Sequence, residues 1–224
     1  MTQTKLTRPE AIIFDMDGTL FQTETLLEIV HKRLFAQLRK EGLYVKDTPP
    51  IERLIACLGM LLDDIWKRVM PDGSPAAYER ANELMLQYEL EELEAGNGTL
   101  YPHVIETLEK LHQRGIKLFV ASNGLEHYVK GVATFHKMHH LFAGVYSAGE
   151  FETSSKVDLV ARLLKDHHLQ DAWMVGDRSS DVEAGLANGL TVIGCRYAGF
   201  GEDYELRGSH RLISSFDELS SFLP

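Results

Sequence analysis

Several features that would place a protein in a special class are scarce or missing in this sequence. Two cysteines in 224 residues, Cys57 and Cys195, lie far apart and match no metal-binding spacing, so no disulfide framework is indicated. Positive charge is in deficit: the formal net charge is −10, and a general nucleic-acid binder would need a basic surface. Apolar runs are far shorter than the roughly 20 residues that span a membrane. The N-terminus also lacks the apolar core of a secretory signal. We therefore expect a cytoplasmic protein that binds neither nucleic acid nor membranes.

What the sequence does contain is a series of short apolar segments typical of strands. Several are rich in valine and isoleucine and apolar on both faces, as in the centre of a parallel sheet. The predicted strands are 11–14, 117–122, 144–148, 172–176, 191–195 and, more weakly, 211–214. Helical patterns lie between them, at 104–115, 156–168 and 181–189. This alternation predicts an α/β fold with helices on both faces of a parallel sheet, a three-layer Rossmann-like core.

The stretch from residue 21 to 98 breaks this alternation, because it contains no strand candidate. Its apolar spacing predicts long helices over 23–42 and 75–96, with one or two shorter helices over 51–70. We therefore expect two domains. Residues 1–20 and 99–224 would form the α/β core, and residues 21–98 an inserted, all-helical domain.

Polar residues follow several of the predicted strands at the point where each strand ends. The first strand runs directly into "DMDGT", where Gly18 allows a sharp turn, the second ends in "SNG" and the fourth in "GDRSSD". A lysine opens the helix between the third and fourth strands. Ligands of open α/β sheets bind outside the carboxyl ends of the strands, so we expect these side chains to converge. They are Asp15, Asp17, Ser122, Asn123, Lys156, Asp177 and Asp181.

With these motifs the chain resembles the haloacid dehalogenase-like (HAD) hydrolase superfamily, and more narrowly its phosphoglycolate phosphatase-like branch with a helical cap. The resemblance covers nearly the whole length and includes "YPHVIETLEKLHQRGIKLFVASNG" (101–124), "GDRSSDVEAGLANGLTVIG" (176–194) and "YAGFGEDYEL" (197–206). It implies a three-layered core, a mobile cap inserted after the first strand, and hydrolysis of a small phosphorylated metabolite.

The resemblance also gives the predicted site residues their roles. Asp15 would be the nucleophile that forms an aspartyl-phosphate. Mg²⁺ prefers hard oxygen ligands and usually keeps some of its water. Asp15, the main-chain carbonyl of Asp17 and Asp177 would supply its protein ligands. Asp181 would hold a coordinated water or make an outer contact.

The remaining predicted residues would handle the proton and the phosphate. Asp17 would protonate the leaving alcohol and then deprotonate the attacking water, which requires a raised pKa. Its presence fits a phosphatase or a phosphomutase better than a dehalogenase. Ser122 and Asn123 would bind phosphate oxygens, and Lys156 would offset the charge of the transferring group.

Some positions stay open between a structural and a functional role. For Arg178 and His103, contact with the substrate and contact with neighbouring loops alone are both open, and for Arg178 the structural role is favoured. In the cap, any of Trp66, Lys67 and Arg68 could face the substrate, although a tryptophan is more often part of a core.

We therefore predict a Mg²⁺-dependent phosphatase of a small phosphomonoester, acting as a monomer or homodimer. A β-phosphoglucomutase-like phosphomutase and a 5′-nucleotidase-type activity are the alternatives, and a non-catalytic binding relative ranks last. The sequence does not name the substrate.

Overall fold

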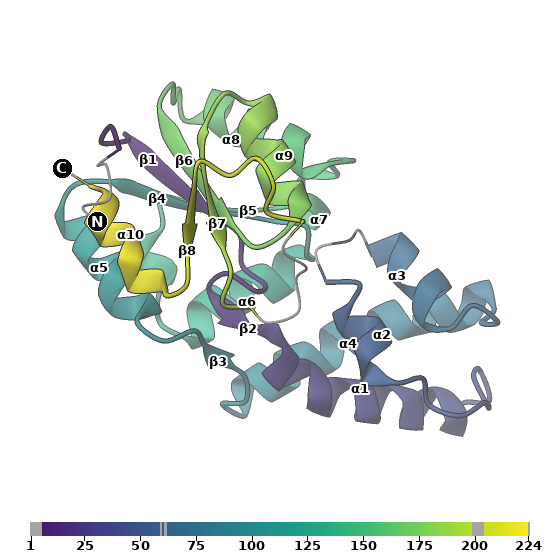
Figure 1. Cartoon of the computed structure of the whole chain (residues 1–224). Coiled ribbons are helices and arrows are strands. Elements are labelled where there is room, and N and C mark those ends of the chain that lie inside the picture. The colour runs from purple at the N-terminus through teal and green to yellow at the C-terminus, as the bar shows by residue number, and fades with distance from the viewer. Residues whose placement is uncertain (1–5, 59, 61, 199–203, 224) are drawn as a thin grey trace.

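A six-stranded parallel sheet forms the centre of the molecule (Figure 1). The structure is a computed structural model that describes residues 6–58, 60, 62–198 and 204–223, without the side chains of 62 and 63. The strands lie in the order β5-β4-β1-β6-β7-β8. Their bounds are Ala11–Phe14 (β1), Lys117–Ser122 (β4), Gly144–Ser147 (β5), Ala172–Gly176 (β6), Thr191–Cys195 (β7) and Arg211–Ile213 (β8). All six predicted strands are present within one residue of their predicted ends.

Strand β1 holds the central position that determines where a ligand can bind. Its Ala11 lies opposite Lys117 of β4 on one side and Ala172 of β6 on the other. The chain continues from β4 to β5 in one direction, and then from β6 through β7 to β8 in the other. The strand order therefore reverses at β1, and the crevice at its carboxyl end is the expected binding place of such a sheet.

Alternate residues of β1 are buried in two different hydrophobic layers. Ile12 and Phe14 belong to a cluster with side chains from α5, α6 and α10. Ala11 and Ile13 belong to a second cluster with side chains from α8 and α9. The bounds are Val104–Gln113 (α5), Glu126–Phe135 (α6), Lys156–Asp166 (α8), Ser179–Ala187 (α9) and Leu219–Phe222 (α10). A strand that is apolar on both faces thus has helices on both faces, and the predicted three-layer α/β fold is confirmed.

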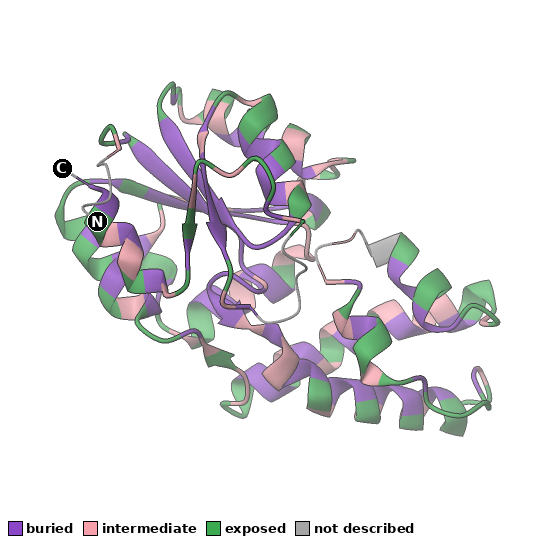
Figure 2. Cartoon of the chain, in the orientation of Figure 1, coloured by how far each residue is buried: buried purple, intermediate pink, exposed green. Residues whose placement is uncertain are grey.

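Helices α1 to α4, which lie in the chain between β2 (Phe21–Gln22) and β3 (Thr99–Leu100), form a separate helical layer, which we call the cap (Figure 1). They are α1 (Thr23–Lys40), α2 (Ile51–Ile55), α3 (Leu62–Val69) and α4 (Pro75–Glu94). The segment 51–70 therefore forms two short helices. Figure 2 shows that α1 and α4 turn buried stripes toward each other and exposed stripes outward. Inside the cap, Trp66 is 1% exposed, and its indole Nε1 donates to Oδ1 of Asn82 at 2.5 Å. Full burial of such a side chain contributes about 1.5–3 kcal/mol.

A two-stranded antiparallel ribbon connects the cap to the core, and the sequence analysis did not predict it. Strand β2 (Phe21–Gln22) pairs with β3 (Thr99–Leu100), so that the chain enters and leaves the cap side by side. Nε2 of Gln22 also donates to the carbonyl of Leu100 at 2.7 Å. We propose that this ribbon is the boundary between the domains 1–20 plus 99–224 and 21–98.

The remaining elements are short. They are α7 (Ala148–Phe151) and the 3-10 helices η1 (His139–Leu141) and η2 (Phe216–Glu218). Within the described ranges, no helix combines the length and the apolar character needed to cross a bilayer.

Candidate active site

The loop after β1 carries Asp15 and Asp17 to the crevice. The amide of Asp15 donates to the carbonyl of Val175 at 2.9 Å, which extends the pairing of β1 with β6 by one residue. The chain then turns at Gly18, whose φ is +78°, and its amide donates to the carbonyl of Phe21 at 3.0 Å. The two aspartates are thereby fixed at the carboxyl edge of the sheet, as predicted.

Gly18 also permits a close approach between this loop and the loop after β6. A Cβ atom at Gly18 would lie 2.4 Å from Oδ2 of Asp177, closer than such atoms can approach. The neighbouring Thr19 donates through Oγ1 to Oδ1 of Asp177 at 3.2 Å. The carboxylate of Asp177 is therefore positioned by the backbone and a hydroxyl of the first loop.

Lys156 joins two of the predicted carboxylates. Its ammonium Nζ donates to Oδ1 of Asp15 at 2.7 Å and to Oδ1 of Asp181 at 2.6 Å, and its side chain is 1% exposed. Burial would lower the pKa of Lys156, but the two carboxylates outweigh burial and raise it. The lysine is the first residue of α8, whose N-terminus is capped by Ser155, with Oγ accepting the amide of Asp158 at 3.1 Å.

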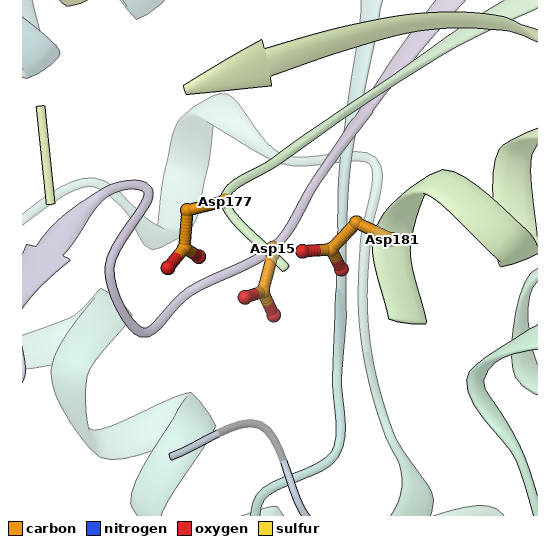
Figure 3. Close-up of side chains that lie close together, drawn as sticks. All are labelled: Asp15, Asp177 and Asp181. Carbon is orange, nitrogen blue, oxygen red and sulfur yellow. The ribbon is translucent and has the colours of Figure 1, made fainter. Parts of the chain in front are cut away.

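Asp15, Asp177 and Asp181 form a compact acidic cluster (Figure 3). One carboxylate oxygen from each lies within 4.8 Å of the others, and all three residues are buried. Oδ2 of Asp177 accepts no hydrogen bond from the described residues and lies 3.7 Å from Nε of Arg178. Buried carboxylates are normally hydrogen-bonded, paired or bound to a metal. Hard oxygen ligands of this kind suit Mg²⁺, so the cluster fits the predicted cofactor.

The raised pKa values of the clustered carboxyls also favour a bound cation. Burial raises the pKa of Asp15 to about 7, with the charges of Asp181 and Asp17 adding to the rise and Lys156 opposing it. Burial, reinforced by Asp15 and Asp181, also raises the pKa of Asp177 well above its usual range. The negative charge of these carboxylates therefore exceeds what the lysine offsets, and a divalent cation would supply the difference.

Asp17 faces the cavity from the other side of Asp15. Its Oδ1 accepts hydrogen bonds from Oγ1 of Thr23 at 2.6 Å and from the hydroxyl of Tyr128 at 2.5 Å. Burial raises the pKa of Asp17, while these two hydrogen bonds oppose the rise. A raised pKa is what the sequence analysis required of a proton donor at this position.

The predicted phosphate-binding pair lies in the same place. Ser122 and Asn123 line the cavity together with Asp15 and Asp17. Ser122 is 1% exposed, and its Oγ accepts the amide of Gly124 at 3.1 Å. The structure thus brings all seven predicted residues to one end of the sheet.

The other wall of the cavity comes from the cap, where the sequence analysis left three positions open. Trp66 is part of the cap core, and Lys67 and Arg68 are exposed; none of the three is among the lining residues. Ile65 faces the cavity instead, one position earlier on α3. The residues of the cap that line the cavity are Thr23, Leu58, Met60, Ile65, Met85 and Glu89. With the cap in this position, the cavity has a volume of about 60 Å³ open to water.

Glu89 of α4 and Tyr128 of α6 are site residues that the sequence analysis missed. Glu89 is 6% exposed, and burial, followed by the charge of Asp17, raises its pKa well above the usual range. It lies in the acid-rich "ELEELEAG" stretch, which reads as a solvated helix face. Tyr128 lies on α6, a helix that was not predicted.

The two positions left open at the loops have structural contacts. Nη1 of Arg178 donates to Oε1 of Glu205 at 2.8 Å, which ties the loop after β6 to the C-terminal segment. His103 is exposed, has a φ of +66° and precedes α5. Neither is among the residues that line the cavity.

The fold and the site together define an α/β enzyme with a capped, acid-lined active site. A family model described as haloacid dehalogenase-like hydrolase matches residues 12–195. The chain belongs to this family. Its relatives include the phosphoglycolate phosphatase of Aliivibrio fischeri, 34% identical over 101 residues that make up 44% of each chain. Another is the pyrophosphatase PpaX of Halalkalibacterium halodurans, 26% identical over 200 residues that make up 86% of each chain.

The solved structures agree on the fold. The crystal structure of CbbY from Rhodobacter sphaeroides in complex with phosphate matches with a TM-score of 0.80 at 22% identity, covering 95% of this chain and 96% of that one. The family model and the curated relatives confirm the superfamily and the enzyme class predicted from the sequence, a hydrolase of the phosphatase type.

Proposed function

We propose that the protein is a Mg²⁺-dependent phosphatase of small phosphomonoesters that works through an aspartyl-phosphate at Asp15. One observation carries the proposal. The Asp15 carboxylate is bonded to Lys156 through Oδ1 and lies at the meeting point of the acidic cluster, Asp17 and the cavity. A nucleophile, cationic groups and a proton donor are the three requirements of this chemistry.

The chain's own residues would act in two steps. In the first, a carboxylate oxygen of Asp15 attacks phosphorus, the bond from phosphorus to the ester oxygen breaks, and Asp17 gives its proton to the leaving alkoxide. In the second, Asp17 takes a proton from water, which attacks the acyl-phosphate and releases inorganic phosphate and free Asp15. Ser122 and Asn123 would bind the non-bridging oxygens. Both hydrogen bonds to Asp17 end on Oδ1, and we propose that Oδ2 exchanges the proton.

Mg²⁺ would be held by Asp15, the main-chain carbonyl of Asp17 and Asp177, with Asp181 holding a coordinated water. Oδ2 of Asp177 supports this assignment, because it accepts no hydrogen bond from the described residues. When bound, the ion offsets the charge of the carboxylates and of the phosphate that approaches them. Lys156, which already bridges Asp15 and Asp181, would contribute the second cation of the site.

The cap would exclude bulk water and contact the leaving group, since it supplies one wall of the cavity. No observation favours the phosphomutase, 5′-nucleotidase or non-catalytic alternatives. A small phosphorylated metabolite as substrate, a cytoplasmic location and a monomer or homodimer stay predictions.

The proposal is tested by replacing the nucleophile. We expect Asp15→Asn to abolish Mg²⁺-dependent release of p-nitrophenol from p-nitrophenyl phosphate, because an amide does not attack phosphorus. Asp171→Asn is the matched control, since Asp171 is exposed on a loop outside the site. Near-normal turnover by folded Asp15→Asn protein would overturn the role of Asp15.

A further inference from the structure

The cavity differs in charge from one built to bind an anionic leaving group. Among the described residues, none that lines it is Lys, Arg or His. Among the described residues of the cap that line the cavity, Glu89 is the one with an ionisable side chain. The others are apolar, apart from the hydroxyl of Thr23.

Glu89 is also set apart from the other acids of its helix. Glu91 and Glu92 pair with Arg33, and Glu83 pairs with Nη1 of Arg80 at 2.7 Å. Glu89 makes no ion pair or hydrogen bond with the described residues, although it is 6% exposed. It lines the cavity from α4, where the next residue, Leu90, packs against Gly131 of α6. A buried carboxyl without a partner, facing a cavity, calls for a partner on the ligand.

The hydroxyl groups beside it are already engaged. Thr23 and Tyr128 both donate to Asp17, so neither is free to receive a carboxylate of a substrate. A carboxylate on the leaving group would be stripped of its hydration shell between Glu89 and Asp17. Among the described residues that line the cavity, no cation would take the place of that water. A leaving group with a hydroxyl or ammonium group would instead donate to Glu89.

We propose that Glu89 determines specificity: the site selects phosphomonoesters whose leaving alcohol is neutral or cationic and carries a hydrogen-bond donor, and it rejects those with a carboxylate. This inference rests on the proposed phosphatase function and names the substrate class within it. It also separates this chain from a relative named for phosphoglycolate, whose leaving group is a carboxylate-bearing alcohol.

Three substrates of equal chain length isolate the charge of the leaving group. They are 2-phosphoglycolate (anionic), 2-hydroxyethyl phosphate (neutral) and phosphoethanolamine (cationic), with p-nitrophenyl phosphate as a general substrate. For the wild type we expect kcat/KM on the neutral and the cationic ester to exceed that on phosphoglycolate by about tenfold or more. A substrate carboxylate would lose its water beside Glu89 and Asp17, and no cation among the described lining residues would offset it. The comparison within the wild type depends on no variant's folding.

Two glutamine variants of α4 then assign the effect to one residue. Glu89→Gln keeps the shape and replaces an ionisable carboxyl with an amide that can donate to a substrate carboxylate, so it should narrow the ratio of neutral to anionic ester by about tenfold. It should also raise KM for phosphoethanolamine. Glu94→Gln, an exposed glutamate on the same helix, should leave all ratios unchanged.

The outcomes separate the inference from the proposed function. If p-nitrophenyl phosphate is hydrolysed through Asp15 but phosphoglycolate is the preferred ester, the inference is wrong and the function stands. The inference is also wrong, and the function still stands, if Glu89→Gln changes the substrate ratios no more than Glu94→Gln does. Both conclusions follow as well if p-nitrophenyl phosphate is hydrolysed but none of the three small esters is. If no Asp15-dependent hydrolysis of p-nitrophenyl phosphate occurs, the proposed function fails and the inference falls with it.

Discussion

At the scale of single residues, the environment of Asp17 distinguishes it from Asp15. Asp15 is bonded to a lysine, which favours the charged form that a nucleophile needs. Asp17 is bonded to the neutral hydroxyls of Thr23 and Tyr128. Burial raises the pKa of both carboxyls, so it is the bonded groups that differ. Two carboxyl groups of one loop thus have different partners, and the partners match the two roles proposed for them.

Replacing Asp17 should separate the two chemical steps. Asp17→Asn can neither donate nor accept the proton, so turnover of alkyl phosphates should fall by roughly 10²–10⁴-fold. p-Nitrophenolate leaves without a proton, so this substrate should still phosphorylate Asp15, and the acyl-phosphate should then accumulate. Intact-mass spectrometry of acid-quenched protein would detect one added phosphoryl group.

The double variant Asp15→Asn/Asp17→Asn provides the control, because it lacks the nucleophile and should gain no mass. Unchanged turnover of alkyl phosphates by Asp17→Asn would argue against its role in proton transfer. If the single and the double variant both gained a phosphoryl group, Asp15 would not be its acceptor.

At the scale of elements, long and regular patterns were predictable and short or irregular ones were not. Most of the six strands of the sheet could be recognised because they are apolar on both faces and are bounded by turns. Strand β8, which begins with Arg211 and has an exposed Leu212, gave a weaker signal. Strands β2 and β3 have two residues each, too few for a periodic pattern. Helix α6 was missed because "EHYVKGVATF" combines a glycine with three β-branched residues, all unfavourable for helices. Tyr128 was missed with it.

The same contrast holds within the site. The seven predicted residues lie in loops after strands or at a helix start, where a polar residue after an apolar run is conspicuous. Residues of the cap wall carry no such signal. Whether Ile65 or Trp66 faces the cavity depends on how α3 packs in the cap, and Glu89 resembles its solvated neighbours in sequence. Their position follows from tertiary packing, which one sequence does not specify.

The turn after β1 allows a prediction about the backbone at Gly18, which affects both stability and metal binding. In Gly18→Ala the new Cβ would meet Oδ2 of Asp177 at 2.4 Å, and the residue would keep a φ of +78°. The left-handed backbone costs about 1–2 kcal/mol for a residue other than glycine. The clash should also displace the Asp177 carboxylate, weakening Mg²⁺ activation by about tenfold or more. Urea unfolding and Mg²⁺ titration of activity measure the two effects.

Gly42→Ala separates the backbone cost from the clash. Gly42, at the end of α1, has a φ of +73° and no atom within 4 Å of the added Cβ. This variant should lose a similar free energy of unfolding, about 1–2 kcal/mol, and keep the wild-type response to Mg²⁺. An equal loss of Mg²⁺ activation in both variants would show that the contact between Gly18 and Asp177 does not position the metal ligand.

At the scale of the whole molecule, the site links stability to cation binding. Asp15, Asp17, Asp177 and Asp181 are buried or nearly so at the edge of the central sheet, and Lys156 is bonded to two of them, Asp15 and Asp181. Uncompensated buried charge opposes folding. A cation that binds only the folded state stabilises it by mass action. The functional site should therefore lower the stability of the metal-free protein and raise that of the metal-bound one.

Asp177→Asn tests this link, because the substitution should have opposite effects with and without the ion. At 100 times its dissociation constant, Mg²⁺ should stabilise the wild type by about 2.7 kcal/mol. For a chain of this length that corresponds to a rise in Tm on the order of 5–10 °C. Asp177→Asn should lose most of this rise. In EDTA its Tm should equal or exceed that of the wild type, because one buried negative charge is gone.

Thermal unfolding followed by circular dichroism measures the Tm of the wild type and of Asp177→Asn, each with Mg²⁺ and with EDTA. Asp171→Asn is the control. If the wild type gained no stability from Mg²⁺, or if Asp177→Asn gained as much, the acidic cluster would not be the cation site.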